Sequence, residues 1–215
     1  MELASMDNYF DGIALKFAEN TGREIIKFLG SGEHGNAYLT NDNKVVKVTT
    51  DLSEYSESRK LINVNAKHIA KIYDCFIVDS NKLKRELPNL RGMWVILLEK
   101  VDHDEIKQRL LFNGLVESFE EQFDEDFFGI LSFFHVGEID KTKMYEYYKN
   151  IDIDSEWKDY FKQLIELIEE LKKYNIKSVD YGPANFGFRG NTLVYFDIGF
   201  GEEDTGFDNH KTMKF

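Results

Sequence analysis

The chain has 215 residues, of which 42% are hydrophobic and 31% charged, and its formal net charge at pH 7 is −12. A chain of this length can form one large domain or two small lobes around a shared cleft. Its negative charge excludes broad binding to nucleic acids or anionic membranes, which needs an excess of Lys and Arg. The single cysteine, Cys75, excludes an internal disulfide, and no apolar run is long enough to span a bilayer. We therefore expect a cytoplasmic protein with no membrane partner.

The first half of the chain has mostly β patterns. Residues 1–22 are expected to form a loosely packed N-terminal extension with at most one helical turn. From Ile25 the sequence predicts a strand, a glycine-rich turn and a second strand, and then a hairpin at 41–43 and a third strand over Lys44–Thr49. Asp51 or Ser53 can cap the helix that follows, which runs to about residue 63, and Glu54 is placed for a capping box to Asp51.

Two further strands are predicted over Ile72–Asp79 and Met93–Glu99. The link between them is expected to be a solvated loop or a contact for an acidic partner, because it carries the basic residues Lys82, Lys84, Arg85 and Arg91.

After Val101 the spacing of apolar residues becomes helical. The pattern predicts a helix over 104–123, a buried aromatic segment over 125–135 and a long amphipathic helix over 155–174, which Asp154 or Ser155 caps. Mostly β patterns up to about residue 99, followed by mostly helical patterns, predict an α+β architecture with two lobes.

Four motifs indicate chemistry on phosphates. Gly30, Gly32 and Gly35 have G-x-G-x-x-G spacing, which lets a backbone lie close to phosphates because no side chain intervenes. Lys47, on the third predicted strand, can reach phosphate oxygens as a point charge.

The other two motifs lie far downstream. Asp180 and Asn185 have D-x-x-x-x-N spacing, and a short hairpin that turns at 189–191 leads to Asp197-Ile198-Gly199, a D-x-G motif. With these four elements in order, residues 25–201 resemble the protein-kinase-like superfamily.

The resemblance implies a two-lobed protein-kinase-like fold, with an extension over 1–22, a small β-rich lobe over 23–101 and a reduced helical lobe over 102–215. It also implies ATP and Mg²⁺ as cofactors. The three glycines would cover the triphosphate and Lys47 would hold its inner phosphates. Glu57 would pair with Lys47, and Glu54, one turn away, is the alternative.

The remaining roles are also implied by the resemblance. Ala37 and Val45 would sandwich the adenine, and the backbone of Glu99 and Val101 would form hydrogen bonds to it. In the second lobe, Asp180 would accept or orient the proton of the attacking hydroxyl. Asn185 and Asp197 would bind Mg²⁺, which prefers hard oxygen ligands.

The sequence also departs from the family pattern. Ser178-Val179 stand where kinases have His-Arg, Gly182 replaces a lysine of Ser/Thr protein kinases, and only sixteen residues follow Gly199. We expect a compact Ser/Thr kinase that acts on a host or cellular protein. The alternatives are a small-molecule kinase of the aminoglycoside or choline type, an AMP transferase, and a catalytically silent kinase-shaped binding or inhibitor protein of phage origin.

Overall fold

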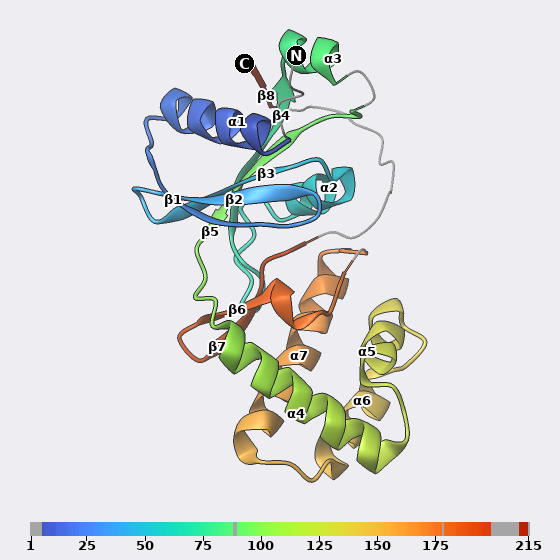
Figure 1. Ribbon diagram of the computed structural model, residues 1–215. Coiled ribbons are helices and arrows are strands. Elements are labelled where there is room, and N and C mark those ends of the chain that lie inside the picture. Colours follow the sequence, from blue (N-terminus) through green and yellow to red (C-terminus); the bar gives the residue numbers. More distant parts are fainter. Residues whose placement is uncertain (1–5, 88–89, 178, 199–210, 215) are drawn as a thin grey trace. The chain divides into compact units, whose positions relative to one another are not determined.

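The computed structural model describes residues 6–87, 90–177, 179–198 and 211–214. Within these residues the chain is a mixed α+β protein with a six-stranded sheet, a two-stranded sheet and helices, which confirms the predicted α+β class. The chain divides into two compact units (Figure 1). The first contains the residues up to Asn65, residues 71–100 and the C-terminal strand, and the second contains residues 66–70 and 101–198.

The first unit is built on the six-stranded sheet, whose strand order is β1-β2-β3-β5-β4-β8. All neighbouring strands are antiparallel except β4 and β8, which are parallel. The strands are β1 Ile25–Ser31, β2 Gly35–Thr40, β3 Lys44–Thr49, β4 Ile72–Asp79, β5 Trp94–Glu99 and β8 Thr212–Lys214, and the helices described in this unit are α1 Met6–Asn20, α2 Leu52–Lys60 and α3 Asn81–Glu86.

Helix α1 covers one face of this sheet (Figure 1, blue helix). Its buried side chains recur at spacings of three and four: Phe10, Ile13, Ala14 and Phe17. They pack in one core with alternate residues of the strands, among them Tyr38, Val46, Val48, Val95 and Leu97. The expectation of a loosely packed extension over 1–22 is therefore wrong, because this segment supplies part of the core of the first unit.

The C-terminal strand also belongs to the first unit. Strand β8 pairs with β4 through the register Ile77–Thr212 and Val78–Met213, and the Met213 side chain is buried in the same core as α1. The Ile77 amide donates a hydrogen bond of 2.9 Å to the Lys211 carbonyl. The expectation that all of 102–215 belongs to the second lobe is wrong for this strand.

The second unit is mainly helical. Its elements are α4 Glu105–Phe123, α5 Phe127–Val136, α6 Lys141–Asn150, α7 Ser155–Lys173, a 3-10 turn over Pro183–Asn185 and the two-stranded sheet of β6 Phe186–Arg189 and β7 Thr192–Tyr195. Helix α7 packs against α4, α5, α6 and β7, and its buried face follows the predicted spacing through Phe161, Leu164, Ile165, Ile168 and Leu171. The prediction of a long amphipathic helix here is confirmed.

Two glutamates of α7 form hydrogen bonds to residues 66–70. The amides of Lys67 and His68 donate hydrogen bonds of 2.9 and 2.8 Å to the Glu170 carboxylate. Glu166 accepts a hydrogen bond of 2.8 Å from Lys67 Nζ and lies 3.1 Å from Nε2 of the buried His68 ring. These polar contacts explain why this short segment belongs to the second unit.

Candidate functional site

The glycine-rich segment forms the turn between β1 and β2. Within it, the Gly32 amide donates a hydrogen bond of 2.8 Å to the Gly35 carbonyl. The carbonyl of His34 accepts a hydrogen bond of 2.8 Å from the Thr50 amide, just after β3. The segment is therefore a closed turn that is fixed to β3, and residues 31–34 of the turn are exposed.

The three glycines differ in the space around them. A Cβ on Gly35 would lie 2.1 Å from the Val48 carbonyl oxygen, so glycine is required there by the close approach of β2 to β3. A Cβ on Gly30, which lies opposite Ala37, would meet nothing within 4 Å, and one on Gly32 would come no closer than 3.9 Å to its nearest neighbour. The open space at Gly30 and Gly32 is what a phosphate group needs in order to approach this backbone.

Lys47 lies on β3, directly opposite Ala37 in β2 and Ile96 in β5. Because side chains alternate along a strand, Val45, Lys47 and their cross-strand neighbour Ala37 share the sheet face opposite to the α1 core. The Lys47 side chain is 18% exposed, and its Nζ lies 2.5 Å from Oε1 of Glu54. The predicted adenine-stacking residues thus lie beside the predicted phosphate-binding lysine.

Helix α2 positions Glu54 through its N-terminal cap. The Asp51 carboxylate accepts hydrogen bonds from the amides of Ser53 and Glu54, at 2.8 and 3.3 Å. In the predicted capping box, the Asp51 amide would donate a hydrogen bond to the Glu54 carboxylate. In the structure this amide donates to Thr49 Oγ1 at 3.0 Å. Asp51 is the predicted cap, but the Glu54 carboxylate instead pairs with Lys47.

The prediction that Glu57 pairs with Lys47 is wrong, and the alternative, Glu54, is the residue that does so. Glu57 lies almost one helical turn further along α2, and its carboxylate is 2.6 Å from Nζ of Lys60 in the same helix. Both glutamates are buried. The first turn of α2 follows β3 directly, which is why the earlier of the two reaches the strand.

Glu99 and Val101, whose backbone is expected to form hydrogen bonds to adenine, belong to different units. The Glu99 amide donates a hydrogen bond of 2.9 Å to the Lys71 carbonyl, so a backbone contact from Glu99 to adenine would have to come from its carbonyl. The Val101 side chain packs on β6, where a Cβ added to Gly187 would lie 2.6 Å from Val101 Cγ2.

In the second unit, Asp180 lies in a loop that is held by hydrogen bonds. The Gly182 amide donates to Asp180 Oδ1 at 2.8 Å, and the Asn185 side-chain amide donates to the Asp180 carbonyl at 3.1 Å. The Asp180 amide in turn donates to the hydroxyl of Tyr195 at 3.2 Å. The loop therefore fixes the backbone of Asp180 and leaves its side chain exposed.

The hairpin of β6 and β7 brings Asn185 and Asp197 together. Phe186 lies opposite Tyr195 in the register of the hairpin, and beyond this pair the Phe196 amide donates a hydrogen bond of 3.0 Å to the Asn185 carbonyl. Asn185 and Asp197 thus flank the open end of one hairpin. Gly199, the last residue of the predicted D-x-G motif, lies outside the described residues.

Two buried tyrosines, Tyr181 and Tyr195, lie next to the predicted catalytic residues, and neither is among the residues predicted from the sequence. Burial, together with the charge of Asp197, raises the pKa of Tyr195 well above its ordinary value. Burial also raises the pKa of Tyr181, whose hydroxyl has no hydrogen-bond partner among the described residues. Tyr195 is therefore neutral, and its hydroxyl accepts the hydrogen bond that supports the Asp180 loop. Its only signal in the sequence is its place two residues before Asp197.

The oxygen atoms of Asn185 and Asp197 fit the ligand preference of Mg²⁺, which in phosphoryl-transfer sites is held by one or two protein groups together with phosphates and water. Within the described part of the chain, no cluster of three or more His, Cys, Asp and Glu side chains could hold a metal by itself. The pair would therefore need the phosphates of a nucleotide to complete the coordination of the ion.

No described helix combines the length and the apolar character needed to cross a membrane. No protein-family model matches this chain, and no curated protein matches its sequence. Proposals about its function therefore depend on the residues described above.

Proposed function

We propose that this protein is an ATP- and Mg²⁺-dependent phosphotransferase that phosphorylates Ser or Thr hydroxyls of a protein acceptor. Its two units would correspond to the small lobe and the reduced large lobe of a protein-kinase-like fold. The observation that carries this proposal is the ion pair between Lys47, on the second strand after the glycine-rich turn, and Glu54 of helix α2.

The Lys47–Glu54 pair suits phosphate binding. A lysine on a rigid central strand, oriented by a buried carboxylate, presents its charge without further ordering of its side chain. The pair also lies beside a turn whose Gly30 and Gly32 leave space for phosphate groups. A purely structural ion pair explains the buried glutamate, but it does not explain this open glycine backbone.

The second unit would supply the groups around the transferred phosphate. The acceptor hydroxyl would form the new bond to the terminal phosphorus, the bond from that phosphorus to the ADP oxygen would break, and Asp180 would take the hydroxyl proton. Asn185 and Asp197 would hold Mg²⁺, which when bound neutralises charge on the phosphates. The exposure of the Asp180 side chain supports this role, because an acceptor can reach it.

A small-molecule kinase is the second candidate, and Gly182 favours it. Ser/Thr protein kinases have a lysine two residues after the catalytic Asp, whereas here the Gly182 amide at that position is bonded to the Asp180 carboxylate. A Cβ at this position would lie 3.2 Å from Asp180 Oδ1, so a larger side chain would crowd the carboxylate.

The test is to incubate the full chain with Mg²⁺ and ATP labelled at either the terminal or the alpha phosphate. Casein and histone serve as general protein acceptors, and choline and kanamycin as small-molecule acceptors. We expect terminal label on protein, loss of transfer with EDTA, and loss of transfer in Asp197→Ala while the circular dichroism spectrum is unchanged. Terminal label on choline or kanamycin alone would support the second candidate. Transfer of the alpha label, or ATP binding without any transfer, would overturn both candidates.

A further inference from the structure

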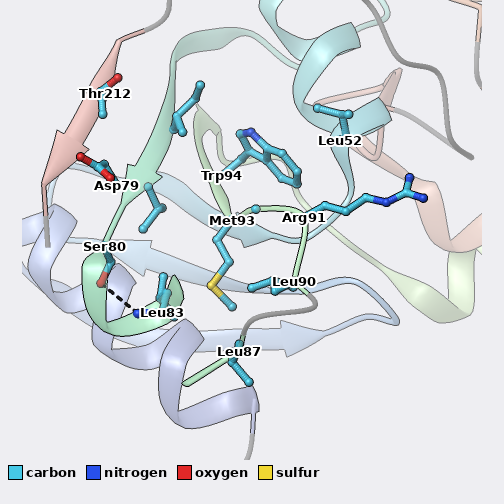
Figure 2. Close-up of a pocket in the computed structure, with 13 residues that line it drawn as sticks. Leu52, Asp79, Ser80, Leu83, Leu87, Leu90, Arg91, Met93, Trp94 and Thr212 are labelled. Carbon is cyan, nitrogen blue, oxygen red and sulfur yellow. Dashed lines mark hydrogen bonds between the residues drawn. The ribbon is translucent and has the colours of Figure 1, made fainter. Parts of the chain in front are cut away.

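A cavity of about 560 Å³ lies in the first unit and is formed by the end of β4, helix α3 and the start of β5 (Figure 2). Its lining is mainly apolar and includes Leu83 and Leu90. Its charged lining residues, Asp79 and Arg91, each interact with another group of the protein, and Lys47 does not line it. The cavity is therefore separate from the proposed phosphotransfer, whereas a histidine of the second unit is connected to it.

His135, in the last turn of α5, contacts residues on both sides of Asp180. Its Nε2 lies 2.8 Å from the carbonyl oxygen of Ile176, which precedes Asp180 by four residues. Its ring lies edge-on to the ring of Tyr181, the residue directly after Asp180, with the two centroids 6.0 Å apart and the planes at 80°. One side chain of α5 thus contacts the chain before the proposed base and the aromatic ring that follows it.

The contact with Ile176 assigns a proton to the His135 ring. A carbonyl oxygen only accepts hydrogen bonds, so Nε2 carries the hydrogen and donates it. Ile176 is buried, and a buried or partly buried carbonyl that loses its donor is costly. The side chain at position 135 must therefore present an N–H group at this point.

The end of α5 is itself held in place. Nζ of Lys172, in the last turn of α7, donates a hydrogen bond of 2.8 Å to the Phe134 carbonyl and lies 4.4 Å from the centroid of the Phe134 ring. The Gly137 amide closes the helix with a hydrogen bond of 3.2 Å to the same carbonyl. The position of His135 is thus set by α7, the helix that leads to Ile176.

Tyr181 connects His135 to the proposed base. Its side chain is buried, and its hydroxyl has no hydrogen-bond partner among the described residues, so packing holds the ring. The next residue, Gly182, donates its amide hydrogen to Asp180 Oδ1 at 2.8 Å. A shift of the Tyr181 ring would therefore disturb the loop that orients the Asp180 carboxylate.

From these contacts we propose that His135 is a positioning residue for Asp180. It fixes the chain on both sides of this residue, by the hydrogen bond that it donates to Ile176 and by the ring contact with Tyr181. His135 then acts through Asp180 and not on the substrate. Its effect on the rate rests on the proposed phosphotransfer, whereas its effect on the loop does not.

Two variants separate the contacts that His135 makes. His135→Phe keeps a ring beside Tyr181 but removes the N–H donor. We expect kcat for transfer to casein to fall about tenfold, the rate equivalent of one hydrogen bond, with KM for ATP unchanged. His135→Gln, which keeps an N–H donor, should recover most of this loss. Val136→Ala, at the neighbouring and exposed position, is the matched control and should behave as the parent.

Amide hydrogen exchange, followed by NMR in the same variants, tests the positioning without the use of activity. The amides of Asp180 and Gly182 both donate hydrogen bonds within the loop. We expect these two amides to exchange about tenfold faster in His135→Phe, as the loss of one hydrogen bond predicts. The amides of Ala70 and Tyr195, which are bonded elsewhere in the second unit, should keep their rates.

Unchanged exchange at Asp180 and Gly182 would overturn the proposal. Faster exchange throughout the second unit would also do so, because His135 would then only stabilise the fold. In an active parent protein, an unchanged kcat in His135→Phe would contradict the positioning role as well. If the parent transfers no phosphate, the proposed phosphotransfer fails, and the exchange rates alone decide whether His135 positions the loop.

Discussion

Lys47 on β3 pairs with Glu54 in the first turn of α2, at 2.5 Å, while Glu57, three residues later, pairs with Lys60 of its own helix. Two buried glutamates on one short helix therefore have different partners. One joins the helix to the central strand of the sheet, and the other forms an ion pair within the helix. We therefore expect substitutions of the two glutamates to differ in their effects on the proposed activity and on stability.

We predict that Glu54→Gln lowers kcat/KM for ATP-dependent transfer by about 10²-fold, because the lysine loses the charge that orients it. Glu57→Gln should leave kcat/KM unchanged and lower the free energy of unfolding by about 1–3 kcal/mol, since it leaves a buried amide next to Lys60. Steady-state kinetics and urea unfolding of both variants measure these effects. Equal kinetic losses in the two variants would contradict the assignment.

The glycines of the turn give a second matched pair. Gly35→Ala should destabilise the protein by about 3 kcal/mol, because its Cβ would collide with the Val48 carbonyl of the neighbouring strand. Gly32→Ala should keep the melting temperature of the parent, because nothing lies within 3.9 Å of its Cβ, and should weaken ATP binding. Thermal unfolding and calorimetric titration with ATP test both statements. Undiminished ATP affinity in a stable Gly32→Ala protein would argue against phosphate binding at this turn.

Tyr195 and Tyr181 allow a similar comparison near Asp180. Tyr195→Phe removes the hydroxyl that accepts from the Asp180 amide, so we expect a loss of about 1 kcal/mol in stability and a lower kcat with little change in KM. Tyr181→Phe should be neutral or stabilising, because it removes a buried hydroxyl with no partner among the described residues. Chemical unfolding and initial rates distinguish the two. A larger kinetic effect for Tyr181→Phe would show that the roles have been reversed.

Stability should fall at acid pH through Glu166. Burial raises the pKa of this carboxyl, but hydrogen bonds from Lys67 and His68 outweigh burial and bring the pKa below its ordinary value of 4.5. A carboxyl whose pKa is lowered on folding contributes stability that is complete above the unfolded pKa and is lost as the pH falls through the folded pKa.

We therefore expect Glu166→Gln to lower the free energy of unfolding by about 1 kcal/mol at pH 7, with the difference from the parent protein shrinking below about pH 4.5. Urea unfolding of both proteins at pH 7 and pH 3.5, followed by circular dichroism, measures it. A difference that stays constant between these pH values would rule out titration of Glu166 as the cause.

Local patterns in the sequence predicted much of the fold. Helix α7 and strands β3, β4 and β5 follow from regular apolar spacing and clear boundaries. Helix α1 has the same kind of spacing in Phe10, Ile13, Ala14 and Phe17, although the expectation for this segment is a loosely packed extension. The basic residues of the link between β4 and β5 favour an exposed loop, whereas Leu83 of α3 is buried.

The candidate site shows where local patterns are not sufficient. The sequence indicated Lys47, Asp180, Asn185 and Asp197, but Glu54 and Glu57 lie on successive turns of the same face of α2, and both are buried. The choice between them depends on how far along β3 the helix begins to pack, and only the packing of α2 sets that position. The pairing of β8 with β4 is likewise non-local, and nothing in the short segment Thr212–Lys214 predicts it.

The position of β8 affects the order of events during translation. Met213 completes the hydrophobic cluster beneath α1, yet the ribosome must synthesise residues 101–198 between β5 and β8. During synthesis the sheet of the first unit therefore lacks β8, and the outer edge of β4 is unpaired, until the helices of the second unit have emerged from the ribosome. Unpaired strand edges are prone to association, so this interval is when a newly made chain is most exposed to chaperones and to aggregation.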